Sequence, residues 1–132
     1  MTADTNVLVR VFVKDDARQA VAAMKLLEEA EAIAIPLSSL CELVWVLRRV
    51  YGLSKVDIAQ ALTTLIGVET VATHRPAVEA GIAALMAGGD FADGVIAYEG
   101  RWLGGETFVS FDRRAVSLLK QQGQKARCLD TE

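Results

Sequence analysis

The chain has 132 residues, 52% of them hydrophobic and 23% charged, and its formal net charge is −3. This composition indicates a globular protein, and residues 1–132 are expected to form a single domain that buries about two thirds of its surface. The small negative charge argues against a broad basic surface held to nucleic acid by counterion release. It leaves open an enzyme that binds RNA through a few arginines and metal ions.

No segment reaches the roughly 20 apolar residues that are needed to cross a bilayer. The N-terminus has neither a basic stretch nor an apolar core, so it does not read as a secretory signal. A cytoplasmic protein is therefore expected. Cys41 and Cys128 have no neighbouring histidines, which favours a reduced pair over a disulfide or a zinc site.

Apolar runs alternate with helical segments along the chain, a pattern typical of a parallel sheet with helices on its faces. Asp16 is expected to cap a helix that ends near Glu31. Its inward-facing side chains are predicted to be Val21, Met24, Leu27, Ala20 and Leu26. The later elements predicted, in chain order, are a strand at 32–35, a buried helix at 39–51, a helix at 54–66, a strand at 68–71, helices at 76–86 and 90–102, a strand at 107–110, a helix at 113–122 and a strand at 126–129.

The opening of the chain gives a conflicting signal. Residues 6–13 are dominated by valine, and β-propensity predicts a strand there. Met1–Ala3 alone would make a poor strand. On propensity, Asp4 would therefore precede the first strand rather than follow it.

Four carboxylates stand where strands are expected to end or helices to begin. They are Asp4, Glu42, Asp93 and Asp112. In open α/β sheets, ligands bind at the carboxyl ends of the strands, so these side chains are expected to share one crevice. Four carboxylates in one crevice repel each other unless a cation is present. Hard oxygen ligands select Mg²⁺ or Mn²⁺, ions that activate water and stabilise charge on a phosphodiester.

A purely structural interpretation stands beside the catalytic one. Ser39 and Glu42 have the spacing of a capping box, Asp90 with Asp93 has the form of a cap, and so has Asp112. Acidic residues in the first turn are also favoured by the helix dipole. Taken singly, each carboxylate is more readily explained as structural.

Glu42 is the strongest exception to the structural interpretation. It is the only charged residue between Ile33 and Leu47, and burying a carboxylate without a partner is costly. Other candidates are weaker. His74 is the only histidine, so a histidine triad is disfavoured, and Arg48 is equally well explained as part of a solvated helix end.

The acidic residues occur in motifs that resemble those of a known family. The motifs are Asp4-Thr-Asn6, the isolated Glu42, Asp90-Phe-Ala-Asp93 with Val95-Ile-Ala97 just after it, and Val-Ser-Phe-Asp112-Arg. Together they resemble the PIN-domain nucleases and, within them, the VapC-type toxins of bacterial type II toxin–antitoxin pairs. The resemblance covers essentially the whole chain and keeps all four motifs in order.

The resemblance implies a three-layer α/β/α fold with a central parallel sheet in the strand order 3-2-1-4-5. Asp4 would end the central strand, and the segment after Asn6 would be a helix instead of the strand that propensity predicts. Thr2 stands where an aliphatic residue is expected, which weakens the first strand.

The resemblance also implies an activity. Asp4 and Asp93 would be the main Mg²⁺ ligands, with Mn²⁺ as a substitute, and Glu42 and Asp112 would complete the pocket directly or through water. All four would be catalytic in the hydrolysis of RNA phosphodiester bonds by a metal-activated water, without a covalent intermediate. Arg10 is a candidate to steer the RNA backbone.

Supporting residues and partners follow from the same resemblance. Asn6 and Ser110 match polar positions that hold the acidic residues in place, and Asp90 matches a less critical acidic position. Proteins of this type are homodimers, and each is inhibited by a small antitoxin whose tail points a basic side chain into the acidic pocket.

Two other functions are weighed against the toxin ribonuclease. One is a catalytically silent PIN-like protein-interaction module, which the intact acidic set argues against. The other is a phosphatase of the haloacid dehalogenase kind, which needs a second aspartate two residues after the first. Asn6 stands at that place, so the phosphatase is discounted.

Overall fold

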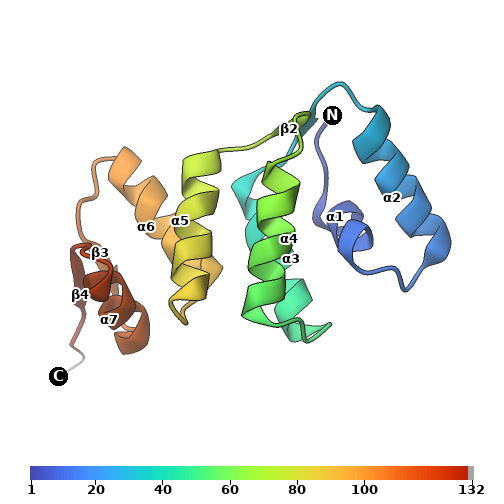
Figure 1. Cartoon of the computed structure of the whole chain (residues 1–132). Helices are drawn as coiled ribbons and strands as arrows, with labels where there is room; N and C mark the ends of the chain where they lie inside the picture. The colour runs from blue at the N-terminus through green and yellow to red at the C-terminus, as the bar shows by residue number, and fades with distance from the viewer. Residues whose placement is uncertain (131–132) are drawn as a thin grey trace. The chain divides into compact units, whose positions relative to one another are not determined.

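The computed structural model describes residues 1–130, and the chain divides into two compact units, Met1–Arg75 and Pro76–Glu132 (Figure 1). Both units combine helices with short parallel strands, so the predicted α/β class is confirmed. The first unit contains α1 (Thr5–Phe12), α2 (Ala17–Glu29), β1 (Ile33–Ala34), α3 (Leu37–Arg49), α4 (Lys55–Ile66) and β2 (Val71–Ala72). The second contains α5 (Arg75–Met86, whose first residue closes the first unit), α6 (Phe91–Trp102), β3 (Phe108–Ser110), α7 (Arg113–Gln121) and β4 (Ala126–Cys128).

The valine-rich opening is the helix α1, so the strand that propensity predicted there is wrong. Asp4 starts this helix by accepting a hydrogen bond from the Thr5 backbone N–H at 2.8 Å. Thr5, Leu8 and Val9 are its buried residues, and this spacing is helical rather than alternating. Burial of that face against α2 and α3 outweighs the strand preference of valine.

In the first unit, short parallel pairings lie just before the candidate carboxylates Asp4 and Glu42 in the sequence. β1 pairs with β2 in the register Ile33 to Val71 and Ala34 to Ala72. On its other side, Ala34 forms a single parallel bridge with Thr2. The strand that was expected to end at Asp4 is therefore reduced to the single bridge at Thr2. The core beneath these strands is aliphatic, and its fully buried side chains include Leu8, Ile33, Ile35, Leu40, Leu43, Leu47, Ile58, Leu62 and Leu65.

In the second unit, β3 pairs in parallel with β4, from Phe108 opposite Ala126 to Ser110 opposite Cys128. Helices α5 and α6 approach closely where Gly94 faces the Ala80 carbonyl, since a Cβ at Gly94 would lie 2.4 Å from that oxygen. This close packing fixes the first turns of α6. In the predicted order 3-2-1-4-5, the first strand corresponds to the bridge at Thr2, and strands 2 to 5 correspond to β1 to β4. The pairings seen within each unit agree with this order, whereas the complete order remains a prediction.

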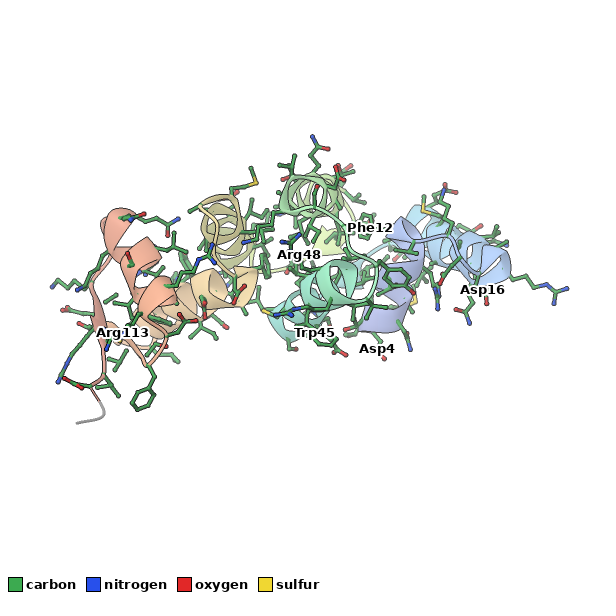
Figure 2. The ribbon with its side chains drawn as sticks, turned by 90° about the horizontal axis from the view of Figure 1, so that it is seen from below. Asp4, Phe12, Asp16, Trp45, Arg48 and Arg113 are labelled. Atoms are coloured by element: carbon green, nitrogen blue, oxygen red, sulfur yellow. The ribbon has the colours of Figure 1, made fainter. Side chains whose placement is uncertain are left out.

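Several predictions about burial and boundaries are wrong. Val21 is 68% exposed although it was expected to face inward, and α2 buries Ala20 and Ala23 instead. Trp45 is 59% exposed, so α3 is not buried on every face as predicted (Figure 2). The strand predicted at 68–71 is β2, shifted to begin at Val71.

Other predictions hold. Asp16 caps α2 by accepting a hydrogen bond from the Gln19 N–H at 3.0 Å. Ser54 caps α4 through the Asp57 N–H at 3.1 Å. Both cysteines are free thiols. Among residues 1–130, no helix has the length and apolar character needed to traverse a bilayer.

Candidate active-site carboxylates

Asp4 and Glu42 belong to the first unit, and Thr5 connects them. The Thr5 hydroxyl donates a hydrogen bond to Glu42 Oε2 at 3.2 Å and lies 3.4 Å from the Ser39 carbonyl oxygen. The Thr5 backbone N–H donates to Asp4 Oδ1. Because Thr5 is only 6% exposed, its position is fixed by packing. One buried residue thus bonds to both candidate ligands of this unit.

Two expectations about Glu42 are corrected by this geometry. Its side chain is exposed rather than buried, so no burial penalty explains it. The capping box with Ser39 is also absent, because α3 starts two residues earlier, after Pro36, and has no side-chain cap. Glu42 lies in the second turn of α3 with Thr5 as its partner. Sequence reasoning missed the role of Thr5, since that role depends on a contact between residues 37 positions apart.

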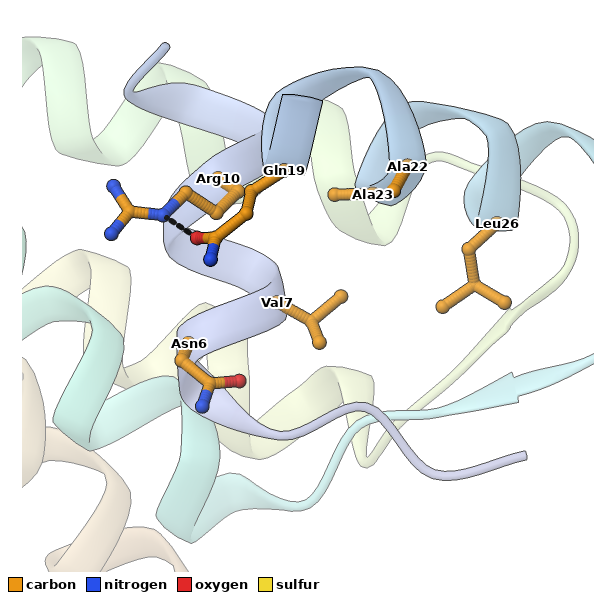
Figure 3. Close-up of a pocket in the computed structure, with 7 residues that line it drawn as sticks. All are labelled: Asn6, Val7, Arg10, Gln19, Ala22, Ala23 and Leu26. Atoms are coloured by element: carbon orange, nitrogen blue, oxygen red, sulfur yellow. Dashed lines mark hydrogen bonds between the residues drawn. The ribbon is translucent and has the colours of Figure 1, made fainter. Parts of the chain in front are cut away.

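For Asn6, the predicted supporting role stays a prediction. Its side chain lines a pocket of about 630 Å³ between α1 and α2, and within residues 1–130 it makes no hydrogen bond to Asp4 or Glu42 (Figure 3). Arg10 lines the same pocket, donating to Gln19 Oε1 at 2.7 Å and pairing with Asp15. Arg10 therefore has a structural function at the α1–α2 connection. The other lining residues are Val7, Ala22, Ala23 and Leu26.

In the second unit, Asp93 stands out electrostatically. It lies half-buried in the first turn of α6, and this burial raises the pKa of its carboxyl group. The negative charges of Asp90 and Asp112 raise that pKa further. Asp93 is thus repelled by two other carboxylates of its own unit, whereas the crevice predicted to hold Asp4, Glu42, Asp93 and Asp112 together stays a prediction.

Asp90 and Asp112 hold similar places at the starts of two helices but behave differently. Asp90 occupies the N-cap position of α6 without making a side-chain cap bond. Asp112 does cap α7, because its Oδ1 accepts from the N–H groups of Arg114 at 3.0 Å and Ala115 at 3.1 Å. Both bonds use one oxygen, which leaves Oδ2 outside the cap. The Ser110 hydroxyl oxygen accepts a hydrogen bond from the Asp112 N–H at 3.0 Å, beside the acidic position that it is predicted to support.

The chemistry of these donors suits a hard divalent cation. All four candidate ligands are carboxylates, and the raised pKa of Asp93 reflects a concentration of negative charge that a cation would relieve. That Asp4, Glu42, Asp93 and Asp112 together hold Mg²⁺ or Mn²⁺ stays a prediction. Within the part of the chain that the structure describes, no group of three or more His, Cys, Asp or Glu side chains is arranged to hold a metal ion.

Comparison with known proteins identifies the family. The family model described as PIN domain matches residues 1–118, a range that includes all four carboxylates. A search of curated proteins finds no match. The matched range takes in every helix and strand of the first unit and extends through most of α7. Because this match covers most of the sequence and the fold is α/β, the chain belongs to the PIN-domain family, whose members are generally metal-dependent nucleases.

Proposed function

We propose that this protein is a Mg²⁺-dependent endoribonuclease of the VapC type, acting as the toxin of a toxin–antitoxin pair. The family supports the nuclease class. The resemblance of all four motifs, in order, to the VapC-type toxins supports RNA as the substrate and the toxin role. Residues 1–132 would act as a single catalytic domain.

The observation that carries the proposal is the half-buried Asp93 carboxyl, whose pKa is raised by burial and by Asp90 and Asp112. Groups with perturbed pKa values and a specific charged partner are typical of functional sites. Keeping like charges close together costs folding free energy, and a bound cation would compensate that cost. Bound Mg²⁺ supplies Lewis acidity that activates water and stabilises charge on the phosphate.

The chain's own residues orient the carboxylates in this proposal. Thr5 holds Glu42 by its hydroxyl and Asp4 by its N–H. The first turn of α7 and Ser110 hold Asp112 at both its side chain and its backbone. These bonds fix the carboxylates before any substrate binds, which lowers the entropy cost of assembling the reactive geometry.

The proposed partners are an RNA substrate, a small antitoxin and a second copy of the chain. An antitoxin that inserts a basic side chain would neutralise the same carboxylates that bind Mg²⁺. Inhibition would then compete with metal binding, and raising the Mg²⁺ concentration would weaken it.

The alternative is a catalytically silent PIN-like protein-interaction module. A module of that kind has no need for the carboxylates that its catalytic relatives use. Here Asp4, Glu42, Asp93 and Asp112 are all present, and the charges of Asp90 and Asp112 disfavour the ionised form of Asp93. These facts favour the enzyme.

The proposal is tested with the purified full chain, total bacterial RNA and single-stranded DNA of matched length. Defined RNA cuts are expected in Mg²⁺, none in EDTA, and a loss of about 100-fold or more in Asp93→Asn. Glu99→Gln is the matched control, because Glu99 is an exposed acidic residue on the same helix. If the wild type cleaves no RNA in either Mg²⁺ or Mn²⁺ and binds neither metal, the result would favour the interaction module.

The toxin role is tested separately by expressing the protein in bacteria. Wild type should arrest growth, Asp93→Asn should not, and co-expression of the small gene adjacent to the toxin gene should restore growth. Efficient RNA cleavage in vitro without any growth arrest would support the ribonuclease activity and contradict the toxin role.

A further inference from the structure

Arg114 makes two contacts that join separate parts of the second unit. Its backbone N–H donates to Asp112 Oδ1 at 3.0 Å, within the cap of α7. Its guanidinium Nη2 donates to the Gly88 carbonyl oxygen at 3.1 Å, across 26 positions of sequence. Arg114 therefore bonds both to the Asp112 side chain and to the turn between α5 and α6.

The turn that receives this bond has little freedom. Gly88 has a φ of +99°, a conformation that favours glycine, and its N–H donates back to Leu85 at the end of α5. Gly89 follows, and a Cβ there would lie 2.8 Å from Leu118 Cδ1 of α7. The turn thus touches α7 at two places, through the Arg114 hydrogen bond and through packing against Leu118.

The acidic residues lie immediately next to these contacts. Asp90 is two residues after Gly88, and Asp93 is in the first turn of the helix that follows. Asp112 is at the start of α7, two residues before Arg114. The charge of Asp112 acts on Asp93, and repulsion between these two carboxylates acts to separate the start of α6 from the start of α7. The bond from Arg114 to Gly88 opposes that separation.

We propose that Arg114 is a positioning residue that braces the start of α7 against the α5–α6 turn and thereby holds Asp112 beside Asp90 and Asp93. Arg114 itself is assigned no contact with substrate or metal. The consequence for metal affinity rests on the proposed function, whereas the bracing rests on the contacts alone. Loss of a residue that orients a ligand typically weakens metal binding by about 10- to 100-fold.

A simpler explanation would be that Arg114 acts only through its positive charge near the carboxylates. Arg113 separates the two explanations. It is the adjacent residue, also exposed and directly after Asp112, and no hydrogen bond or ion pair of its side chain occurs among residues 1–130 (Figure 2). Removing Arg113 removes the same charge from the same turn but leaves the bond to Gly88 in place.

The test compares full-length wild type, Arg114→Ala, Arg114→Lys and Arg113→Ala. Calorimetric titration with Mg²⁺ alone, without RNA, should show affinity about tenfold weaker in Arg114→Ala and within twofold of wild type in Arg113→Ala. Arg114→Lys retains a donor and should recover part of the loss. In cleavage assays the Mg²⁺ concentration for half-maximal rate should rise, while the rate at saturating Mg²⁺ changes less.

A second measurement needs no metal. Amide hydrogen exchange across residues 88–93 should be faster in Arg114→Ala than in wild type and unchanged in Arg113→Ala. Equal exchange and equal Mg²⁺ affinity in the two alanine variants would overturn the bracing. If wild type neither binds Mg²⁺ nor cuts RNA, the proposed function fails, and hydrogen exchange alone then decides whether Arg114 is a brace.

Discussion

The two units hold their carboxylates by different physical means. In the first unit, Asp4 and Glu42 accept hydrogen bonds from one buried neutral residue, Thr5. In the second unit, Asp93 is half-buried near two other carboxylates, and its pKa is raised by burial and by their charges. Hydrogen bonds also hold Asp112 in the second unit, but that unit in addition contains electrostatic repulsion that the fold has to withstand.

This difference predicts different responses to mutation. A change at Thr5 should leave Glu42 less well positioned and slightly lower the free energy of unfolding, because it removes the hydrogen bond to Glu42. A change at Asp93 should cost activity yet make the metal-free fold more stable, because it removes a charge that the fold disfavours. Such opposite effects on stability and activity are characteristic of functional sites.

The largest expected effect is at Asp112, where capping and catalysis can be separated. Asp112→Asn keeps a good capping side chain and should leave the free energy of unfolding within about 0.5 kcal/mol of wild type. It should nevertheless reduce RNA cleavage by about 100-fold or more, because a charged oxygen is lost. Asp112→Ala should lose the cap as well, costing about 1 kcal/mol. Urea unfolding and RNA cleavage measure the two quantities, and wild-type cleavage by Asp112→Asn would reduce this residue to a helix cap.

A smaller effect is expected at Thr5. Thr5→Val preserves shape but removes the hydroxyl that holds Glu42, so cleavage should fall about tenfold and stability by about 1 kcal/mol. Thr63→Val is the control, because the Thr63 hydroxyl donates to the Ala59 carbonyl oxygen of its own helix, at 2.8 Å. Similar cleavage by the two variants would show that the Thr5 hydroxyl does not position Glu42 for catalysis.

The smallest effect concerns stability and its dependence on pH. A carboxyl whose pKa is higher in the folded state than its ordinary value of 3.8 stabilises the fold when protonated, and that stabilisation is lost as pH rises through the raised pKa. In EDTA at neutral pH, Asp93→Asn should therefore unfold at a slightly higher Tm than wild type. The gap should close as pH falls towards 3.8. Thermal unfolding across pH 4 to 8 follows it, and a gap that widens at acidic pH would contradict the assigned direction.

Much of the fold was predictable because its signals are local. The Asp16 cap, the Ser54 cap and the glycine-bounded helices lie within a few residues of the elements they define. Propensity alone mispredicts the opening, because the valines of residues 6–13 favour a strand. The structure instead has the helix that the family resemblance implied, with Thr5, Leu8 and Val9 buried at helical spacing. The strands were harder still, since each is only two or three residues long.

The candidate site was predictable in its residues but not in its supports. The motifs identify Asp4, Glu42, Asp93 and Asp112 because their types and order are visible in the sequence. The bonds that hold them join residues far apart in the sequence, such as Thr5 with Glu42, so no local pattern reveals them. Glu42 shows the limit most clearly: its isolation in an apolar helix suggested burial, yet its side chain is exposed.

The most direct test of the central claim compares one carboxylate from each unit in the same RNA cleavage assay with Mg²⁺. Glu42→Gln and Asp93→Asn are measured beside Glu28→Gln and Glu99→Gln, which change exposed acidic residues of the same two units. The account predicts that both site variants lose about 100-fold or more while both controls stay within about twofold of wild type. Wild-type cleavage by either site variant would contradict a ribonuclease that uses carboxylates from both units.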